Sequence, residues 1–384
     1  MYSPSLNHII ASIDDNPYPV LEISEAVLYH NFNLVKKITG FKSKILIPVK
    51  ANAYGCGIAE LMPFFKTAQP DFLGVASPFE AHLVRKFGWN GKILNLGGFY
   101  ESMAHYFTEY NITPSITDLF QIEILNHLAR QKNTVLKVHI KLDFGMGRIG
   151  ILIDGIKNVI EKLKTAVNLK VTGIFTHFPS SDNVMAESNI KIITRFNEYS
   201  GLIIEELKLS RSEVILHAAN SYAIMLNPQS HLDMVRPGLS FYGYFSTEED
   251  REKLSPEFPF KPVLSLKARP ISIRKLPAGF SVSYGETCKV SEKEQSVGVI
   301  PLGYADGIPR LLSNKISFQG HPLLGRVTMD QIVVGGLTQL KDTLILLGEG
   351  SYPLERWADI SGTISYEILV RLGERIQRKL VSGK

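Results

Sequence analysis

Short apolar segments alternate with longer amphipathic segments through the first two-thirds of this 384-residue chain. The apolar segments are rich in Val and Ile and lack strict polar alternation, which is typical of strands buried on both faces. Eight of them predict strands, at residues 44–49, 72–76, 93–96, 114–117, 135–143, 169–177, 214–217 and 233–236. The amphipathic segments predict helices, at residues 24–39, 57–68, 79–88, 100–110, 119–132, 155–167, 186–208 and 219–227.

This alternation restricts the fold class to α/β. Eight strands with seven clear helices between them predict a (β/α)8 TIM-type barrel. A doubly wound open sheet is the alternative. No GxGxxG follows the first strand, which argues against the nucleotide-binding form of that sheet.

The pattern changes after about residue 246. Strand-like segments separated by Pro and Gly turns then predominate, at residues 263–275, 280–284, 296–304, 324–335 and 343–347. One late helix is predicted at residues 364–380. We therefore expect a barrel domain over residues 1–245, in which the residues before about 20 form an N-terminal arm, and a mostly β C-terminal domain over residues 246–384.

Composition narrows the possible partners. The 42 basic and 37 acidic residues give a net charge of only +5, and no dense Lys/Arg run suggests a nucleic-acid surface. Two cysteines in so long a chain do not form a disulfide framework. The sequence shows neither a secretory signal nor an apolar run long enough to span a membrane. We expect a cytoplasmic protein with a small-molecule substrate, no nucleic-acid or membrane partner, and no metal.

Polar residues gather at the predicted carboxyl ends of the strands, where barrels carry their chemistry. Lys50 follows the first strand. A lysine in a partly apolar site loses its proton more easily, and a neutral lysine can form a Schiff base with a carbonyl cofactor. Other strand ends carry polar groups that could each have a structural role as ion-pair members, core histidines or helix caps: Lys141, Arg148, His177, His217, Asn220, Ser221 and Arg236.

The last two strand ends supply Ser221 at a helix start and a glycine turn at Gly238. Barrels often bind phosphate at this place through backbone N–H groups. A lysine across the mouth from a phosphate site indicates pyridoxal 5'-phosphate.

Eight sequence blocks, in order, resemble those of the alanine racemase family. They are PVKANAYG (48–55), KLDFGMGRIG (141–150), HAANSY (217–222), VRPGLSFYG (235–243), VSYG (282–285), GYADGIPR (303–310), GRVTMDQ (325–331) and TISYEI (363–368). The resemblance extends from about residue 20 to about residue 372. It implies a pyridoxal-phosphate-dependent isomerase that interconverts L- and D-alanine through a cofactor aldimine, and it implies D-alanine supply for peptidoglycan.

The resemblance also implies roles for individual residues. Lys50 would carry the cofactor and act as the base on the D-face, and Tyr284 would be the base for the L-enantiomer. The cofactor would further be held by Tyr54, His177, Asn220, Ser221, Arg236, Gly238, Leu239 and Tyr366. The substrate carboxylate would be bound by Arg148 and the backbone of Met329. Supporting residues would be Lys141, which matches a lysine often carbamylated in the family, and His217, Tyr304 and Asp330.

In this family the tyrosine of the VSYG block enters the barrel mouth of a second subunit, so the resemblance implies a homodimer with shared sites. The residue types suit racemisation, which removes a proton from one face and returns one to the other and so needs two bases. Arg236 would stay protonated and leave the cofactor ring nitrogen unprotonated. That arrangement weakens the ring as an electron sink.

Some features depart from the family pattern. Cys56 stands where a His is usual, Phe144 stands where a Thr is common, and the usual ending is not evident in residues 373–384. A serine, lysine or broad-specificity racemase on the same scaffold is the alternative, although Tyr366 should restrict side-chain room and favour alanine. A cofactor carrier built on the barrel alone would lack VSYG, and a related decarboxylase would place an acid where Arg236 stands.

Overall fold

The computed structural model describes residues 19–181, 187–291 and 293–382. The chain divides into two compact units. The barrel unit comprises Asn31–Ala53 and Leu61–Phe241. The β unit comprises the residues up to His30, Tyr54–Glu60 and the residues from Tyr242 onward. The domain boundary expected between residues 245 and 246 remains a prediction.

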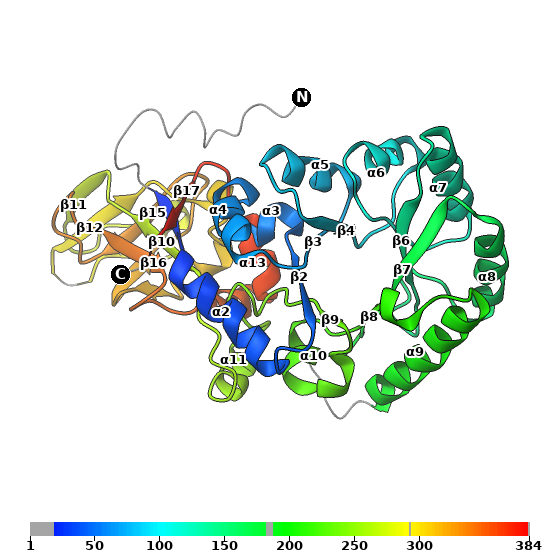
Figure 1. Ribbon diagram of the computed structural model, residues 1–384. Helices are drawn as coiled ribbons and strands as arrows, with labels where there is room; N and C mark the ends of the chain where they lie inside the picture. Colours follow the sequence, from blue (N-terminus) through cyan, green and yellow to red (C-terminus); the bar gives the residue numbers. More distant parts are fainter. Residues whose placement is uncertain (1–18, 182–186, 292, 383–384) are drawn as a thin grey trace. The chain divides into compact units, whose positions relative to one another are not determined.

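Eight parallel strands form the barrel unit (Figure 1). They are β2 (Lys44–Pro48), β3 (Phe72–Val75), β4 (Lys92–Asn95), β5 (Ser115–Ile116), β6 (Leu136–Lys141), β7 (Leu169–Phe175), β8 (Ile215–His217) and β9 (Met234–Val235). Their hydrogen-bonded orders are β4-β3-β2-β9 and β5-β6-β7-β8. A parallel bridge between Leu94 and Thr113 and a bond from the Asp233 N–H to the Leu216 carbonyl join the two sets. The predicted barrel is therefore confirmed.

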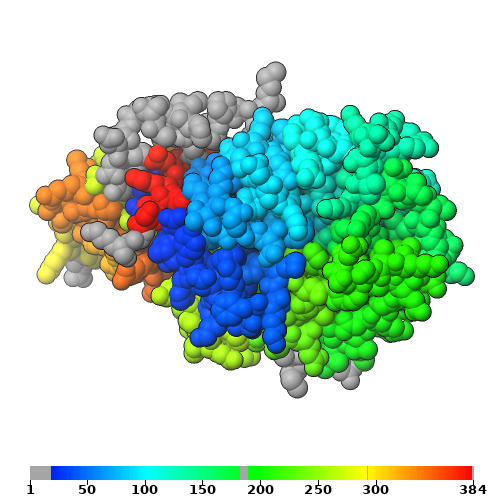
Figure 2. Space-filling view, viewed as in Figure 1, coloured from blue at the N-terminus to red at the C-terminus, as the bar shows by residue number. Residues whose placement is uncertain are grey.

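Helices connect the strands and cover them from outside. In the barrel unit they are α5 (Pro78–Lys86), α6 (His105–Glu109), α7 (Phe120–Gln131), α8 (Ile156–Thr165), α9 (Glu187–Glu206) and α10 (Ser221–Leu226). In α7 the buried residues Ile122, Leu125 and Ala129 recur at helical spacing, as expected of one face packed on a sheet. The outer sides of these helices form much of the cyan-to-green surface in Figure 2.

The barrel interior is filled with side chains. Leu46, Phe72, Leu94 and Met234, from four different strands, form one buried apolar cluster. A filled interior leaves the two ends of the barrel as the places where a ligand can bind.

Two sheets form the framework of the β unit. The first has the order β16-β10-β1-β17, and the second has the order β11-β12-β15-β14-β13. Their strands are β1 (Val20–Ser24), β10 (Leu264–Ala268), β11 (Ser272–Leu276), β12 (Gln295–Ile300), β13 (Ser317–Phe318), β14 (His321–Leu324), β15 (Ile332–Gly335), β16 (Leu344–Leu347) and β17 (Gln377–Val381). Three helices belong to the same unit, α11 (Glu248–Leu254), α12 (Leu354–Ser361) and α13 (Ser365–Arg371).

Helix α2 (Glu25–Ile38), the segment α3 (Lys50–Tyr54) and helix α4 (Ile58–Ala68) each contain residues of both units. The helix predicted at residues 24–39 corresponds to α2, and the one predicted at residues 57–68 corresponds to α4. Among the described residues, no helix combines the length and the apolar character that crossing a membrane requires.

Two predictions for the C-terminal part were wrong. The late helix expected at residues 364–380 ends at Arg371, and residues 377–381 form β17, which pairs in parallel with β1. The strand expected at residues 280–284 is a single antiparallel bridge from Ser281 to Lys289 followed by a short 3-10 turn. Positive φ angles at Ser283 (62°) and Gly285 (73°) prevent an extended strand there.

Candidate functional site

Lys50 follows strand β2 at the carboxyl end of the barrel. The chain then makes a left-handed turn, with φ between 52° and 55° at Ala51, Asn52, Ala53 and Tyr54. Each non-glycine residue in this conformation costs roughly 1–2 kcal/mol. Strained backbone of this kind is typical of functional sites, because the surrounding structure has to hold it in place.

Glu80 holds this turn against the neighbouring strand end. Its Oε1 accepts a hydrogen bond from the Ala51 N–H at 2.8 Å, and its Oε2 accepts one from the Ala76 N–H at 2.7 Å. Glu80 lies in the first turn of α5, whose N-cap is Ser77. One carboxylate therefore ties the lysine-bearing turn to the segment that follows β3.

The surroundings of Lys50 favour its neutral form. Although Lys50 as a residue is exposed, desolvation of its ammonium at the barrel mouth lowers its pKa, and the positive charge of Arg148 lowers it further. Arg236 acts in the same direction, whereas Glu80 opposes them. A lysine with a lowered pKa is a stronger candidate for Schiff-base formation and for proton transfer near neutral pH.

Lys141 ends strand β6 on the same face and is almost completely buried. Burial lowers its pKa to about 8, helped by the charges of Arg148 and Arg236. Its Nζ lies 5.9 Å from the centre of the Phe175 ring, and the guanidinium carbon of Arg236 lies 5.5 Å from the same centre. Both basic side chains therefore lie close to the Phe175 ring at the barrel mouth.

Asp143 shapes the loop that carries Arg148. Its Oδ1 accepts hydrogen bonds from the N–H groups of Gly145 (2.9 Å), Met146 (2.8 Å) and Gly147 (3.3 Å), and its Oδ2 accepts one from the Arg148 N–H at 3.2 Å. Burial alone would raise the pKa of Asp143, but these four bonds lower it overall. Arg148 is exposed, so its guanidinium is available to an anion.

Arg236 is buried behind the mouth and is held almost entirely by neutral acceptors. It donates to His217 Nδ1 (2.9 Å), to the Thr176 carbonyl (2.8 Å) and to the Ala218 carbonyl (2.9 Å), with His177 Nδ1 at 3.4 Å. Burial lowers its pKa to about 9, and no carboxylate of the described residues pairs with it. The guanidinium is therefore a fixed cation that a ligand ring nitrogen could face.

A chain of histidines extends from Arg236 into the barrel. Because an arginine can only donate, His217 must accept through Nδ1 and carry its proton on Nε2. That nitrogen lies 3.0 Å from Nδ1 of His139, a buried residue of β6. Burial and nearby cations lower the pKa of His139 and of His177 to about 3, and that of His217 falls well below its ordinary value. All three rings are neutral near pH 7.

Two strand ends form a turn rich in N–H groups. Asn220 caps α10, accepting from the Ala223 N–H at 3.1 Å and donating to Ser181 Oγ at 2.8 Å. The hydroxyl oxygen of Ser221 accepts from the N–H groups of Gly238 (3.0 Å) and Ser240 (3.1 Å). Between these two, the N–H of Leu239 donates to no described residue. The turn suits an oxyanion such as phosphate.

The β unit contributes a second group of predicted residues. The rings of Tyr54 and Tyr366 lie 6.0 Å apart, and Tyr54 stacks on Tyr242 at 4.8 Å. Burial raises the pKa of Tyr54 well above its ordinary value, and the neighbouring Tyr366 hydroxyl raises it further. The Tyr54 hydroxyl therefore stays protonated and remains a hydrogen-bond donor. Cys56 is buried and burial raises its pKa to about 12, which makes it an inert thiol rather than a reactive one.

Tyr284, Tyr304 and Met329 are exposed on adjoining loops of the β unit. Their exposed fractions are 74%, 45% and 54%, large values for such side chains. The Tyr304 N–H donates to the Thr328 carbonyl at 2.9 Å, and the Ala305 N–H donates to the Met329 carbonyl at 3.0 Å. A hydrogen bond of 2.7 Å from Ser283 Oγ to the Arg326 carbonyl attaches the Tyr284 loop to the chain that precedes Met329.

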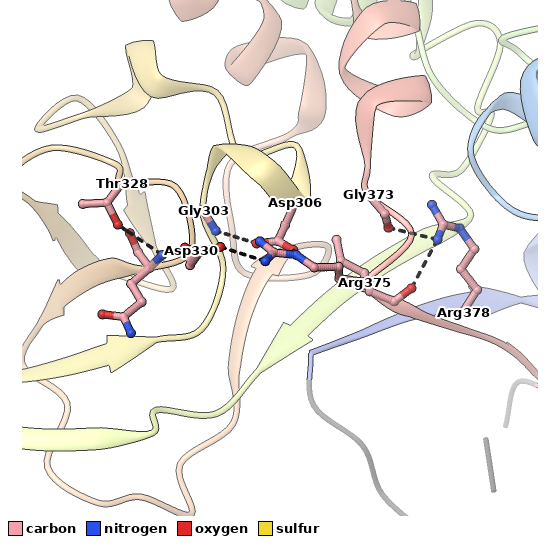
Figure 3. Close-up of polar contacts among 9 residues, drawn as sticks. Gly303, Asp306, Thr328, Asp330, Gly373, Arg375 and Arg378 are labelled. Atoms are coloured by element: carbon pink, nitrogen blue, oxygen red, sulfur yellow. Dashed lines mark hydrogen bonds and ion pairs between the residues drawn. The ribbon is translucent and has the colours of Figure 1, made fainter. Parts of the chain in front are cut away.

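Arg375 connects these loops from the C-terminal segment (Figure 3). It donates to Asp306 Oδ1 (2.8 Å), to Asp306 Oδ2 (2.9 Å) and to Asp330 Oδ1 (2.7 Å). Asp306 is buried and also accepts from the Gly303 N–H at 2.8 Å. Arg375 therefore connects the turn that carries Tyr304 with the turn that carries Met329 and Asp330.

The sequence prediction missed Glu80, Asp143, His139 and Arg375 as site residues. Asp143 had a local signal, since an aspartate two residues before a glycine-rich loop commonly accepts its N–H groups. His139 could have been found from its position two residues before Lys141, which places both on the inner side of one strand. Glu80 and Arg375 act through contacts distant in sequence and left no such signal.

Known proteins resemble the whole chain. The family model described as "Alanine racemase, N-terminal domain" matches residues 23–246, and "Alanine racemase, C-terminal domain" matches residues 263–380. A protein named alanine racemase from Halothermothrix orenii is 34% identical over 371 residues, which cover 93% of this chain and 95% of that protein.

Solved structures resemble it as well. The alanine racemase of D-cycloserine-producing Streptomyces lavendulae has a TM-score of 0.87 at 28% identity, covering 96% of this chain and 99% of that one. The alanine racemase of Bartonella henselae with covalently bound pyridoxal phosphate has a TM-score of 0.82 at 27% identity, covering 95% and 100%. Together with the barrel whose mouth carries Lys50, Arg148 and Arg236, these matches show that the chain belongs to the alanine racemase family.

Proposed function

We propose that Lys50 and Tyr284 are the two bases with which this chain interconverts L- and D-alanine. The chain is a pyridoxal-phosphate-dependent racemase by its family. The observation that carries the residue assignment is the position of Lys50, which follows the end of a barrel strand and is itself followed by a strained left-handed turn. Burial there lowers its pKa, and the charges of Arg148 and Arg236 lower it further.

The residues present fit pyridoxal phosphate. The Leu239 N–H and the Ser221 hydroxyl would hold the phosphate, with Asn220 fixing the helix start beside them. Tyr54 and Tyr366 would add hydroxyl donors. Arg236 would face the pyridine nitrogen, and His177 would support it. When bound, the cofactor would withdraw electrons from the substrate Cα and make its proton easier to remove.

The remaining residues would bind and orient the substrate. The exposed guanidinium of Arg148 and the N–H of Met329 would bind the carboxylate. Lys141 would orient Arg148. Its pKa of about 8 leaves a substantial neutral fraction near neutral pH, and a neutral amine is the form that carbon dioxide can carbamylate.

We further propose a homodimer in which Tyr284, Tyr304 and Met329 complete the site of the partner subunit. Asp330 would support these residues from the β unit, and His217 would support Arg236 within the barrel. The exposure of these three side chains on adjoining loops supports this proposal, because large apolar and aromatic groups gathered on one surface commonly mark an interface. We also propose that the protein works in the cytoplasm and supplies D-alanine for peptidoglycan.

Isotope exchange at Cα tests the two-base assignment. The two enantiomers have equal free energy, so any variant must lose kcat/KM equally in both directions, and turnover rates alone cannot assign a base to a face. We expect Tyr284→Phe in D2O to slow racemisation about 10²–10⁴-fold. D-alanine should still exchange its Cα proton through Lys50, whereas L-alanine should not.

Two controls complete the experiment. Tyr352→Phe removes the hydroxyl of another exposed tyrosine of the β unit and should leave both exchange and racemisation unchanged. Lys50→Ala should abolish exchange of both enantiomers. Exchange of L-alanine by Tyr284→Phe at the wild-type rate would refute the assignment. Relative rates on alanine, serine and lysine would separate an alanine racemase from the broad-specificity alternative.

A further inference from the structure

A cavity opens at the amino-terminal end of the barrel, opposite the face that carries Lys50. Its volume is about 430 Å³, within the range of small-ligand sites. It is lined by Phe72, Asn90, Gly91, Lys92, Ile93, Asn111, Thr113, Lys137, Lys170, Thr172, Glu213 and Ile215. Lys141 at the catalytic mouth lies four positions after Lys137 of this cavity on β6, a distance of about 13 Å along a strand. The cavity is therefore separate from the catalytic site.

The lining is strongly cationic. It contains three lysines, Lys92, Lys137 and Lys170, and one acid, Glu213, so the formal charges sum to +2. Glu213 pairs with Lys170 at 3.1 Å. Among the described residues, Lys92 and Lys137 have no carboxylate partner, and Lys92 Nζ instead lies 5.2 Å from the centre of the buried Phe72 ring.

The lysines are brought together by strand register. Lys137 of β6 and Lys170 of β7 are direct partners in the parallel ladder. Like charges placed directly opposite each other destabilise a sheet. Glu213 compensates the charge of Lys170. The charge of Lys137 is left without a carboxylate partner among the described residues, and a bound anion would compensate it.

Uncharged donors surround the lysines. The side chains of Asn90, Asn111 and Thr113 line the same cavity. Amide and hydroxyl donors beside ammonium groups are the groups that bind oxyanions in proteins. A lining with an excess charge of +2 matches a ligand with two negative charges.

We propose that this cavity binds a small dianion with phosphate or paired carboxylate groups, held by Lys92, Lys137 and Lys170. Inorganic phosphate is the probe for a phosphate ligand, and malonate is the probe for a ligand with paired carboxylates. The protein is the cofactor-loaded full chain, and the measurement is its melting temperature at constant ionic strength maintained with sodium chloride, which removes general screening effects.

The expected result has two parts. At saturating concentration, at least one probe should raise the melting temperature of the wild type by about 2–4 °C. Lys137→Gln and Lys170→Gln should lose this response. Lys137→Gln should also melt about 1–2 °C higher than the wild type without a probe, because it removes the like-charge pair.

Lys157→Gln is the matched control. It removes the same charge from an exposed position on α8, outside the cavity, and should keep the wild-type response. The proposal would be overturned if neither phosphate nor malonate raises the melting temperature above that in sodium chloride of the same ionic strength. It would also be overturned if the rise in melting temperature survives in the Lys137→Gln/Lys170→Gln double variant. That result would mean that the probe binds elsewhere, for example at the catalytic mouth.

Discussion

Gly173 offers a direct test of the histidine chain behind Arg236. A Cβ added at this glycine would lie 2.4 Å from Cε1, 2.5 Å from Nδ1 and 2.6 Å from Nε2 of His139. Because an ordinary contact begins near 3.4 Å, the imidazole would have to move by about 1 Å. The ring is completely buried between Phe72 and His217, so it has little room to do so.

The size of the effect follows from two terms. Overpacking a buried site costs about 1–3 kcal/mol. A shift of about 1 Å would stretch the 3.0 Å bond between His139 and His217 beyond hydrogen-bond range and leave a buried donor unsatisfied, which costs about 1–3 kcal/mol more. We therefore expect Gly173→Ala to destabilise the protein by about 2–6 kcal/mol. Its melting temperature should fall by about 4 °C or more.

Two companion variants isolate the cause. Gly201→Ala lies in helix α9, where an added Cβ meets nothing within 4 Å, and it should stabilise by up to about 1 kcal/mol. In a His139→Val background, Gly173→Ala should cost much less than in the wild type, because the clashing ring is gone. Scanning calorimetry of the four variants gives the comparison. Equal costs of Gly173→Ala in both backgrounds would refute the reasoning.

Three further predictions concern charge. Since burial lowers the pKa of His139 to about 3, the unfolded chain binds a proton that the folded chain does not between about pH 3 and 6.5. Stability should therefore decline as the pH falls below 6.5, and His139→Val should flatten that decline by up to about 1.4 kcal/mol per pH unit in denaturant titrations. Carbamylation of Lys141 should rise with pH through about 8, its pKa, and appear as a ¹³C carbamate signal that Lys141→Arg lacks. Arg375→Gln removes the hydrogen bond to Asp330 and so releases the turn that carries Met329. We expect it to raise KM for alanine more than it lowers kcat. An unchanged KM with a lower melting temperature would assign Arg375 a purely structural role.

The barrel was predictable because its strands are buried on both faces and carry their own local signal. Apolar runs bounded by turns predicted β2 to β9, and the rule that barrels react at the carboxyl ends of strands then placed Lys50 and Arg236 on one face. The strand β1 was not predicted. Its partners β10 and β17 lie more than two hundred residues away in sequence, so no neighbouring segment indicates the pairing.

Local pattern also failed near the C-terminus. Residues 372–380 contain apolar and charged residues at spacings that suit a helix as well as a strand, and pairing with β1 decides in favour of the strand. In the same way Glu80 and Arg375 are ordinary charged residues in the sequence. Only the folded chain shows that one carboxylate joins two strand ends and that one guanidinium bridges two aspartates.

The position of β1 inside its sheet has a consequence for synthesis on the ribosome. The strand begins at Val20 and is among the first parts of the chain to emerge, yet it lies between β10 and β17, and the latter ends at Val381. At about 5–20 residues per second, roughly 20–70 s pass before its second neighbour exists. During that time the strand VLEIS has at least one edge without its native partner and is open to wrong partners. A nascent chain stalled before β17 should therefore aggregate even though every residue of the barrel has already been made.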